Sequence, residues 1–132
     1  FDFSGRSPRA EYWWFYLLMI VMTFATATVD AIVDPEAELG VGVAGMLFSV
    51  ATMIPWLAVS VRRFHDLNMS GWNIFKPLVG LIVCFGLSVF GGVGIVLGLL
   101  FFAGTLLWML VMMCLPGTPG PNRYGPPPRC AS

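Results

Sequence analysis

The sequence has very little charge. Only 11% of its 132 residues are charged, 58% are hydrophobic, and the mean hydropathy is +0.82. A soluble domain has about 25% charged residues and about 45–50% apolar ones. This composition argues against a soluble globular enzyme. It also argues against a nucleic-acid binder, which needs a basic surface, so we expect no nucleic-acid partner. The formal net charge of +0 by itself says nothing about partners.

Paired cysteines and a second histidine are also lacking. Cys84, Cys114 and Cys130 are far apart and form no Cys-x-x-Cys pair, which argues against a zinc ribbon and a disulfide framework. Haem bound by two histidines is excluded because His65 is the only histidine. His65 precedes Asp66, but no nucleophile motif accompanies them. We therefore expect no catalytic residue, no metal and no cofactor.

Three long stretches of the chain carry no charge at all: residues 12–29, 39–61 and 78–115. A membrane-spanning helix needs about 20 apolar residues, so the first two stretches each predict one span. The third has 38 residues and would be about 57 Å long as a single helix, nearly twice the hydrocarbon thickness. It therefore predicts a hairpin of two helices, with the turn at Gly91, Gly92 and Gly94.

The predicted fold class is thus an all-α polytopic membrane protein with four transmembrane helices. We expect residues 1–132 to form a single integral membrane domain, whose last part, residues 116–132, is a cytoplasmic tail. The spans are expected at about residues 12–30, 39–61, 77–92 and 94–115. Two alternatives remain, three spans or two spans plus a re-entrant hairpin, because further glycines weaken the helices of the third stretch.

The basic residues are distributed unevenly about these spans. The four-span arrangement places all seven on one side: Arg6, Arg9, Arg62, Arg63, Lys76, Arg123 and Arg129. The opposite loop, residues 30–38, has four acidic residues and no basic one. Because Lys and Arg concentrate in cytoplasmic loops, we expect a bacterial inner-membrane protein with both termini in the cytoplasm.

Three polar blocks lie on this expected cytoplasmic side. They read FxGRxxRxEYW from residue 3, RRxHDxxxSGW from residue 62, and PGxxGxNRYGxxP from residue 116. In this order the blocks resemble the YhaH-type family of small bacterial inner-membrane proteins, catalogued as domain of unknown function 805. The resemblance covers nearly the whole chain. It implies an integral inner-membrane protein and supplies no activity.

The blocks predict a cytoplasmic charge cluster. Arginine suits pairing with carboxylates or with phosphates, so two hypotheses stay open. In a structural clamp, the N-terminal arginines and the tail arginine bind the two acidic residues. In an anionic headgroup site, the surplus of arginine binds lipid phosphate. The predicted members are Arg6, Arg9, Glu11, Arg62, Arg63, His65, Asp66 and Arg123.

Small residues recur at four-residue spacing in the third stretch. The predicted helix-packing ridge consists of Gly80, Cys84, Ser88 and Gly92, continued by Gly94 and Gly98. Such a ridge lets membrane helices approach closely, within the chain or against a partner. We expect its first four members to pack on the first two spans and the last two to remain available to a partner.

Within the second stretch, Pro55 lacks the N–H that would bond Ala51, so a helix kink is predicted there.

The spans carry no charged residue at mid-membrane, where proton pumps and ion-coupled carriers usually need one. The sequence therefore favours a non-catalytic accessory or assembly subunit. Its helix faces and Arg-rich cytoplasmic face would contact a larger membrane-protein complex or the lipid bilayer, anionic lipid headgroups included. The alternative is a small oligomeric transporter or channel.

The predicted orientation is testable by cysteine labelling. In a chain whose native cysteines are replaced, a cysteine at Asp34 should react with an impermeant maleimide applied from the periplasm. A cysteine at Arg123 should react only after the membrane is permeabilised, because four spans return the tail to the cytoplasm. Periplasmic labelling at position 123 would instead support three spans.

Overall fold

The computed structural model describes residues 2–33 and 42–128. Its helices are α1 (Arg9–Val33), α2 (Val43–Asp66), the 3-10 helix η1 (Gly71–Phe75), α3 (Lys76–Ser88) and α4 (Gly91–Cys114). Four helical segments, of which the third joins η1 to α3, are long and apolar enough to cross a membrane. The predicted all-α fold with four membrane helices is confirmed. Asp34, Glu36, Glu38, Arg129 and Cys130 lie outside the described residues.

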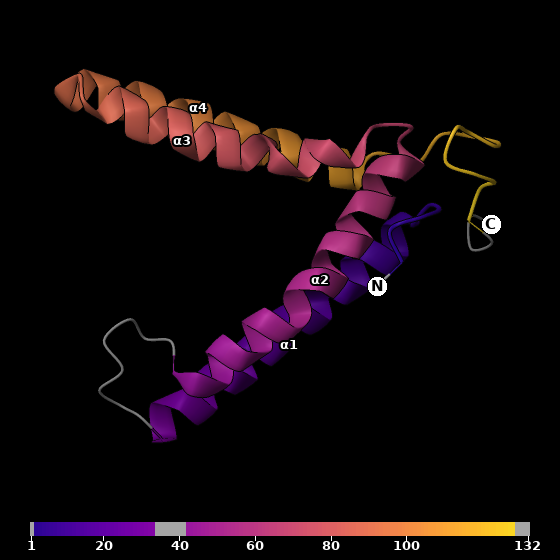
Figure 1. Ribbon diagram of the computed structural model, residues 1–132, viewed down its shortest axis with the longest axis horizontal. Coiled ribbons are helices and arrows are strands. Elements are labelled where there is room, and N and C mark those ends of the chain that lie inside the picture. The colour runs from indigo at the N-terminus through magenta and orange to yellow at the C-terminus, as the bar shows by residue number, and fades with distance from the viewer. Residues whose placement is uncertain (1, 34–41, 129–132) are drawn as a thin grey trace.

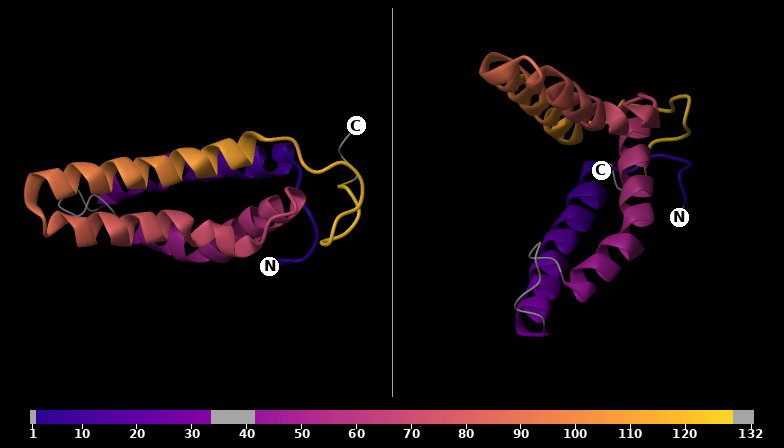
Figure 2. Two further views of the ribbon diagram at one scale, coloured as in Figure 1. Left: turned by 90° about the horizontal axis from the view of Figure 1, so that it is seen from above. Right: turned by 60° about the vertical axis from the view of Figure 1, so that its left-hand side comes forward.

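The helices form two antiparallel hairpins that diverge from a common end (Figures 1 and 2). α1 packs along α2, and α3 packs along α4. The hairpins meet where α2 ends and η1 begins, and the N-terminal segment and the tail gather at the same place (Figure 1). We call this end the vertex; it comprises residues 5–12, 58–75 and 113–125.

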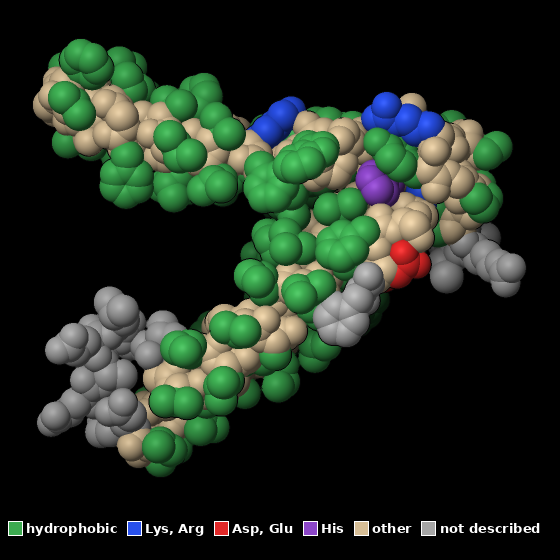
Figure 3. All heavy atoms as spheres, viewed as in Figure 1, with side chains coloured by type: hydrophobic (Ala, Val, Ile, Leu, Met, Phe, Trp, Pro, Cys, Tyr) green, Lys and Arg blue, Asp and Glu red, His purple; other side chains and the backbone are tan. Residues whose placement is uncertain are grey.

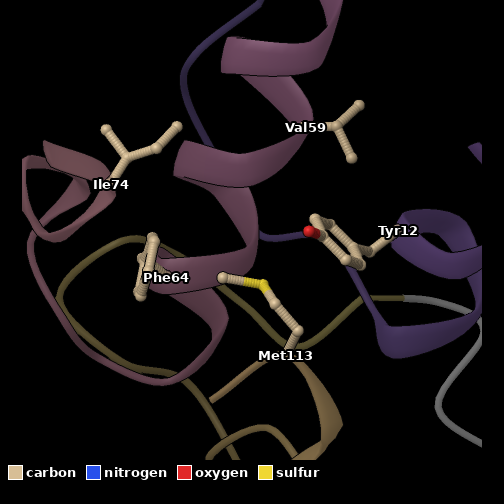
Figure 4. Close-up of a cluster of buried hydrophobic side chains, with 5 residues drawn as sticks. All are labelled: Tyr12, Val59, Phe64, Ile74 and Met113. Atoms are coloured by element: carbon tan, nitrogen blue, oxygen red, sulfur yellow. The ribbon is translucent and has the colours of Figure 1, made fainter. Parts of the chain in front are cut away.

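The buried apolar core is small and lies at the vertex. Its members are Tyr12 of α1, Val59 and Phe64 of α2, Ile74 of η1 and Met113 of α4 (Figure 4). Away from it, large apolar side chains are exposed on all four helices (Figure 3). This distribution suits a membrane protein, because lipid is as apolar as the side chains and gives them no reason to turn inward.

The two hairpins are joined by an aromatic stack and a cation–π contact at the Trp108 ring. Phe64 of α2 stacks on Trp108 of α4, with ring centroids 6.0 Å apart. The ammonium of Lys76, at the start of α3, lies 3.9 Å from the centroid of the same Trp108 ring. Side chains from α2, α3 and α4 therefore meet at one indole, which fixes where the second hairpin leaves the first.

The far end of the first hairpin is closed by Asp30. The sequence pattern assigned Asp30 to the acidic loop, and this assignment is wrong: α1 continues to Val33 and buries the Asp30 side chain. Its carboxylate accepts hydrogen bonds from the N–H groups of Ala44 at 2.9 Å and Gly45 at 2.7 Å. A carboxylate is favourable at a helix N-terminus, where the first N–H groups lack intrahelical acceptors. Asp30 thus caps α2.

The α3–α4 hairpin turns at Val89 and Phe90. Gly91, the first residue of α4, has φ +71°, a left-handed conformation that glycine adopts without steric cost. The turn is therefore found beside the glycines that mark it in the sequence. Pro55 lies inside α2, which runs on to Asp66; the kink expected at this proline stays a prediction.

The small-residue ridge packs differently from our expectation. A Cβ on Gly98 would lie 2.8 Å from Cys84 Cα, and one on Gly80 would lie 2.5 Å from Thr105 Oγ1. Gly94 faces the Leu87 carbonyl. The ridge thus joins α3 to α4 and does not pack on the first two spans.

Gly98 is therefore buried within the chain, and the expectation that it is available to a partner is wrong. Two ridge members lie outside the contact: Ser88 donates to the Phe85 carbonyl, and Gly92 has open space beyond its Cα. Four-residue spacing identifies one helix face, but the short turn at Val89 and Phe90 determines which helix that face meets.

A leucine at Gly98 should separate α3 from α4, whereas one at Gly104 should be tolerated. The first side chain would overlap the Cys84 backbone, and a Cβ on Gly104 meets no atom within 4 Å. Overpacking costs about 1–3 kcal/mol, so we expect Gly98→Leu to lower the thermal midpoint in detergent, followed by circular dichroism. Equal midpoints for the two variants would contradict this close packing.

Candidate functional site

Asp66, the last residue of α2, lies at the centre of the vertex and is 3% exposed. Arg6 donates from Nε to Oδ1 at 2.9 Å, and Arg63 donates from Nη1 to Oδ2 at 2.6 Å. The side chains of these arginines are 2% and 0% exposed, respectively. One buried carboxylate therefore serves two buried guanidinium groups, which come from the N-terminal segment and from α2.

The remaining donors of Arg6 bind the tail. Nη1 donates to the Gly120 carbonyl and Nη2 to the Thr118 carbonyl, both at 2.6 Å. The tail also bonds directly to the end of α2, because Thr118 donates from its N–H to the Asp66 carbonyl at 2.9 Å. A Cβ on Gly117 would overlap the Asp66 carboxylate, so glycine is needed for this approach.

Arg63 binds the end of α4. Its guanidinium donates to the Met113 carbonyl at 3.3 and 3.4 Å and to the Leu115 carbonyl. The last carbonyls of a helix lack intrahelical partners and carry partial negative charge. Arg63 therefore caps α4 while its Nη1 binds Asp66, and in this way it ties the second hairpin to the first.

A second ion pair lies at the edge of the cluster. Arg62 Nη2 lies 2.8 Å from Glu11 Oε1, and the two side chains are 24% and 41% exposed. The Arg62 carbonyl also accepts a hydrogen bond from the Ser7 N–H at 3.1 Å. This pair links the start of α1 to α2, but its exposure makes it weaker than the pairs at Asp66.

Two predicted clamp arginines bind carbonyls instead of carboxylates. Arg9 Nη1 donates to the Cys114 carbonyl at 3.3 Å, and Arg123 Nη2 donates to the Asn68 carbonyl at 3.0 Å. The part of the hypothesis that paired them with acidic residues is wrong among the described residues. The two acidic residues already accept from other arginines, which leaves these two positive charges unneutralised.

His65 and Asp66 have separate partners. The His65 ring stacks on Tyr124 with centroids 3.8 Å apart, and its Nδ1 lies 3.3 Å from the Gly5 carbonyl oxygen. The Asn122 side chain donates to the His65 carbonyl at 2.9 Å, which adds another link to the tail. Neighbouring residues of a helix point in different directions, so these two form no dyad. Nowhere in residues 2–33 and 42–128 do three potential metal ligands cluster.

Two hollows adjoin the vertex where α1 meets the end of α4. A cavity of about 720 Å³ is lined by Arg6, Arg9, Ala10, Asp66 and tail residues that include Thr118 and Gly120. An apolar notch of about 250 Å³ lies further along the same helices. Its lining consists of Tyr12, Trp13, Tyr16, Trp56, Leu106, Met109, Leu110 and Met113.

Another notch, of about 300 Å³, lies between α1 and α2. Met19 and Thr23 of α1 line it, with Phe48, Ser49, Thr52, Met53 and Trp56 of α2. Trp56 also lines the apolar notch between α1 and α4, which we call the α1–α4 notch, so the two notches adjoin at this side chain. We call the notch between α1 and α2 the hydroxyl notch, after Thr23, Ser49 and Thr52 in its lining. The sequence analysis did not find it, because hydroxyl residues on two different helices leave no signature at fixed spacing.

These features define a class of protein: a polytopic helical membrane protein whose described basic residues are gathered at one end of two hairpins. Residues 1–126 match the family described as "Protein of unknown function (DUF805)". The chain belongs to this family, and the resemblance noted in its sequence is confirmed.

Curated relatives agree with this assignment. The chain is 30% identical over 129 residues to inner membrane protein YhaH of Escherichia coli K12, covering 96% of this chain and 87% of that protein. It is 32% identical over 133 residues to inner membrane protein YhaI of the same strain, covering 98% and 88%. No solved structure matches the chain. The protein is thus an integral inner-membrane protein.

Removal of the Asp66 charge should destabilise the fold far more than removal of the Glu11 charge. Asp66→Asn leaves two buried guanidinium groups without a counter-charge, and breaking such a pair costs about 3–5 kcal/mol. Glu11→Gln affects an exposed pair worth about 1 kcal/mol or less. Thermal unfolding of both variants in the same detergent measures the difference. Equal midpoints would show that the Asp66 pairs contribute little.

Proposed function

We propose that the protein is a non-catalytic accessory subunit, in which the vertex holds two hairpins apart so that a helix of another membrane protein packs between them. Both hairpins contact each other near the vertex, through Tyr12, Phe64, Trp108 and Met113. Beyond it they diverge, and their large apolar side chains are exposed (Figures 1 and 3). A rigid joint with separated arms suits a protein that receives a partner.

The hydroxyl notch is the observation that carries this proposal. Thr23, Ser49 and Thr52 donate their hydroxyls to the carbonyls of Met19, Gly45 and Phe48 of their own helices, at 2.7–2.8 Å. The oxygen lone pairs remain at an apolar surface where lipid chains offer no hydrogen bond. Small and hydroxyl side chains are enriched where membrane helices pack, because they allow close approach. A helix fits this surface better than lipid does.

The charge distribution supports a cytoplasmic position for the vertex. The described arginines, Arg6, Arg9, Arg62, Arg63 and Arg123, all belong to it, and Lys76 lies beside it. Positive residues remain on the cytoplasmic side of inner-membrane proteins. In this orientation both termini are cytoplasmic, and the space between the hairpins opens toward the periplasm.

A photo-crosslinking side chain tests the partner surface in membranes of the source bacterium. Placed at Thr52, in the hydroxyl notch, it should give one discrete adduct with a different membrane protein. Placed at Val50, it should give no such adduct, because Val50 is 64% exposed and is not among the residues that line the hydroxyl notch. The two positions lie on opposite sides of α2 at nearly the same depth, which makes Val50 a matched control.

Mass spectrometry of the adduct identifies the partner. Equal adducts at both positions, or none at either, would contradict a helix in the hydroxyl notch. Adducts with a second copy of the chain alone would favour the small oligomeric transporter or channel over the accessory subunit.

A further inference from the structure

We infer that the vertex binds the phosphodiester group of an anionic phospholipid beside Arg9, with an acyl chain in the α1–α4 notch. This inference extends the role of the vertex beyond the proposed subunit function, and it requires no partner protein. It rests on the charge of the vertex, on the position of Arg9, and on the order in which a charged cavity and an apolar notch follow each other along one face of α1.

The first step is the charge of the cluster. Arg6 and Arg63 share the carboxylate of Asp66, and Arg62 binds Glu11. Arg9 completes a set of four arginines near three carboxylates, those of Asp66, Glu11 and the exposed Asp2, which leaves one positive charge in excess. The excess positive charge is that of Arg9, which is exposed beside the buried pairs of Arg6 and Arg63 with Asp66, and clustered arginines of this kind attract an anionic headgroup.

The second step is the position of Arg9. Its side chain lines the cavity of about 720 Å³, and Nη1 makes one long hydrogen bond of 3.3 Å to the Cys114 carbonyl. Its other guanidinium N–H groups donate to none of the described residues, so they are available to a phosphate oxygen. Ala10, in the first turn of α1, lines the same cavity, and N–H groups of a first helical turn also favour anions. Asp66 lines the cavity too, but both its carboxylate oxygens accept from arginines.

The third step separates a lipid from free phosphate. Trp13 and Tyr16 follow Arg9 at four and seven residues, so they lie on the same face of α1. Both line the apolar notch against Leu106 and Leu110 of α4. Aromatic rings of this kind lie at the headgroup level of a bilayer. A charged cavity followed by an aromatic, apolar notch matches a phosphate followed by an acyl chain, whereas free phosphate would use the cavity alone.

Binding of short-chain lipids to the purified full chain in detergent tests the inference by native mass spectrometry. Dioctanoyl phosphatidylglycerol should bind the unmodified chain more tightly than dioctanoyl phosphatidylcholine, which has the same chains and no net charge. Arg9→Gln should weaken phosphatidylglycerol binding about fivefold, the contribution of one arginine near an anionic lipid. Arg9→Lys should restore part of this binding.

Arg123→Gln is the matched control. Arg123 is also an exposed arginine of the vertex bonded to one carbonyl, but it does not line the cavity, so its loss should leave phosphatidylglycerol binding unchanged. Arg9→Gln must also keep the thermal midpoint of the unmodified chain. Inorganic phosphate at equal concentration should not displace the lipid.

Three results would overturn the inference: equal binding of the two lipids, equal effects of the two glutamine variants, or displacement by inorganic phosphate. A changed midpoint for Arg9→Gln would also overturn it, because Arg9 would then be a structural residue. The crosslinking at Thr52 measures a different surface, so either proposal can fail while the other stands.

Discussion

The buried carboxylate of Asp66 is the group on which the arrangement of both hairpins depends. Arg6 and Arg63 are removed from water to reach it, and the cost of their desolvation is offset because nearly every remaining donor finds a backbone carbonyl. Those carbonyls belong to the tail and to the end of α4. Satisfying the charges therefore requires the N-terminal segment, α2, α4 and the tail to meet at one place. Packing in lipid alone does not specify such a meeting.

This requirement that four segments meet at Asp66 explains why charged residues gather in three short blocks of the sequence. A helix surrounded by lipid needs only apolar side chains, and α4 is apolar on all sides. The information that relates one hairpin to the other must then reside at the ends of the helices. The vertex holds it as hydrogen bonds and an ion-pair cluster, and the contacts around Trp108 beside the vertex add to it. Away from the vertex, sequence is free to serve other surfaces, and the hydroxyl notch is one of them.

The helices themselves were predictable from sequence because charge marks their ends. Gaps between charged residues locate the spans, and the length of residues 78–115 requires a hairpin. Convergence of the polar blocks followed from topology. The partner of each arginine could not be predicted, because nothing in the spacing indicates that Arg9 binds a carbonyl while Arg6 binds Asp66. Asp30 was misplaced because an acidic residue at a helix end looks the same in sequence whether it is solvated or caps the next helix. The ridge was assigned to the wrong helices because four-residue spacing identifies a helix face and does not say which helix that face meets.

The place of the tail in the chain has a consequence for biogenesis. Residues 117–122 supply the carbonyls that accept from Arg6, and they donate hydrogen bonds to the backbone carbonyls of His65 and Asp66. A ribosome produces them after all four helices. Until then, Arg6 lacks two of its acceptors, and the two inserted hairpins are joined by the contacts of Trp108 and Arg63 without the tail. The tail is therefore the last part of the vertex to be added. The N-terminal segment and the end of α2 thus acquire these hydrogen-bond partners only when residues 117–122 leave the ribosome.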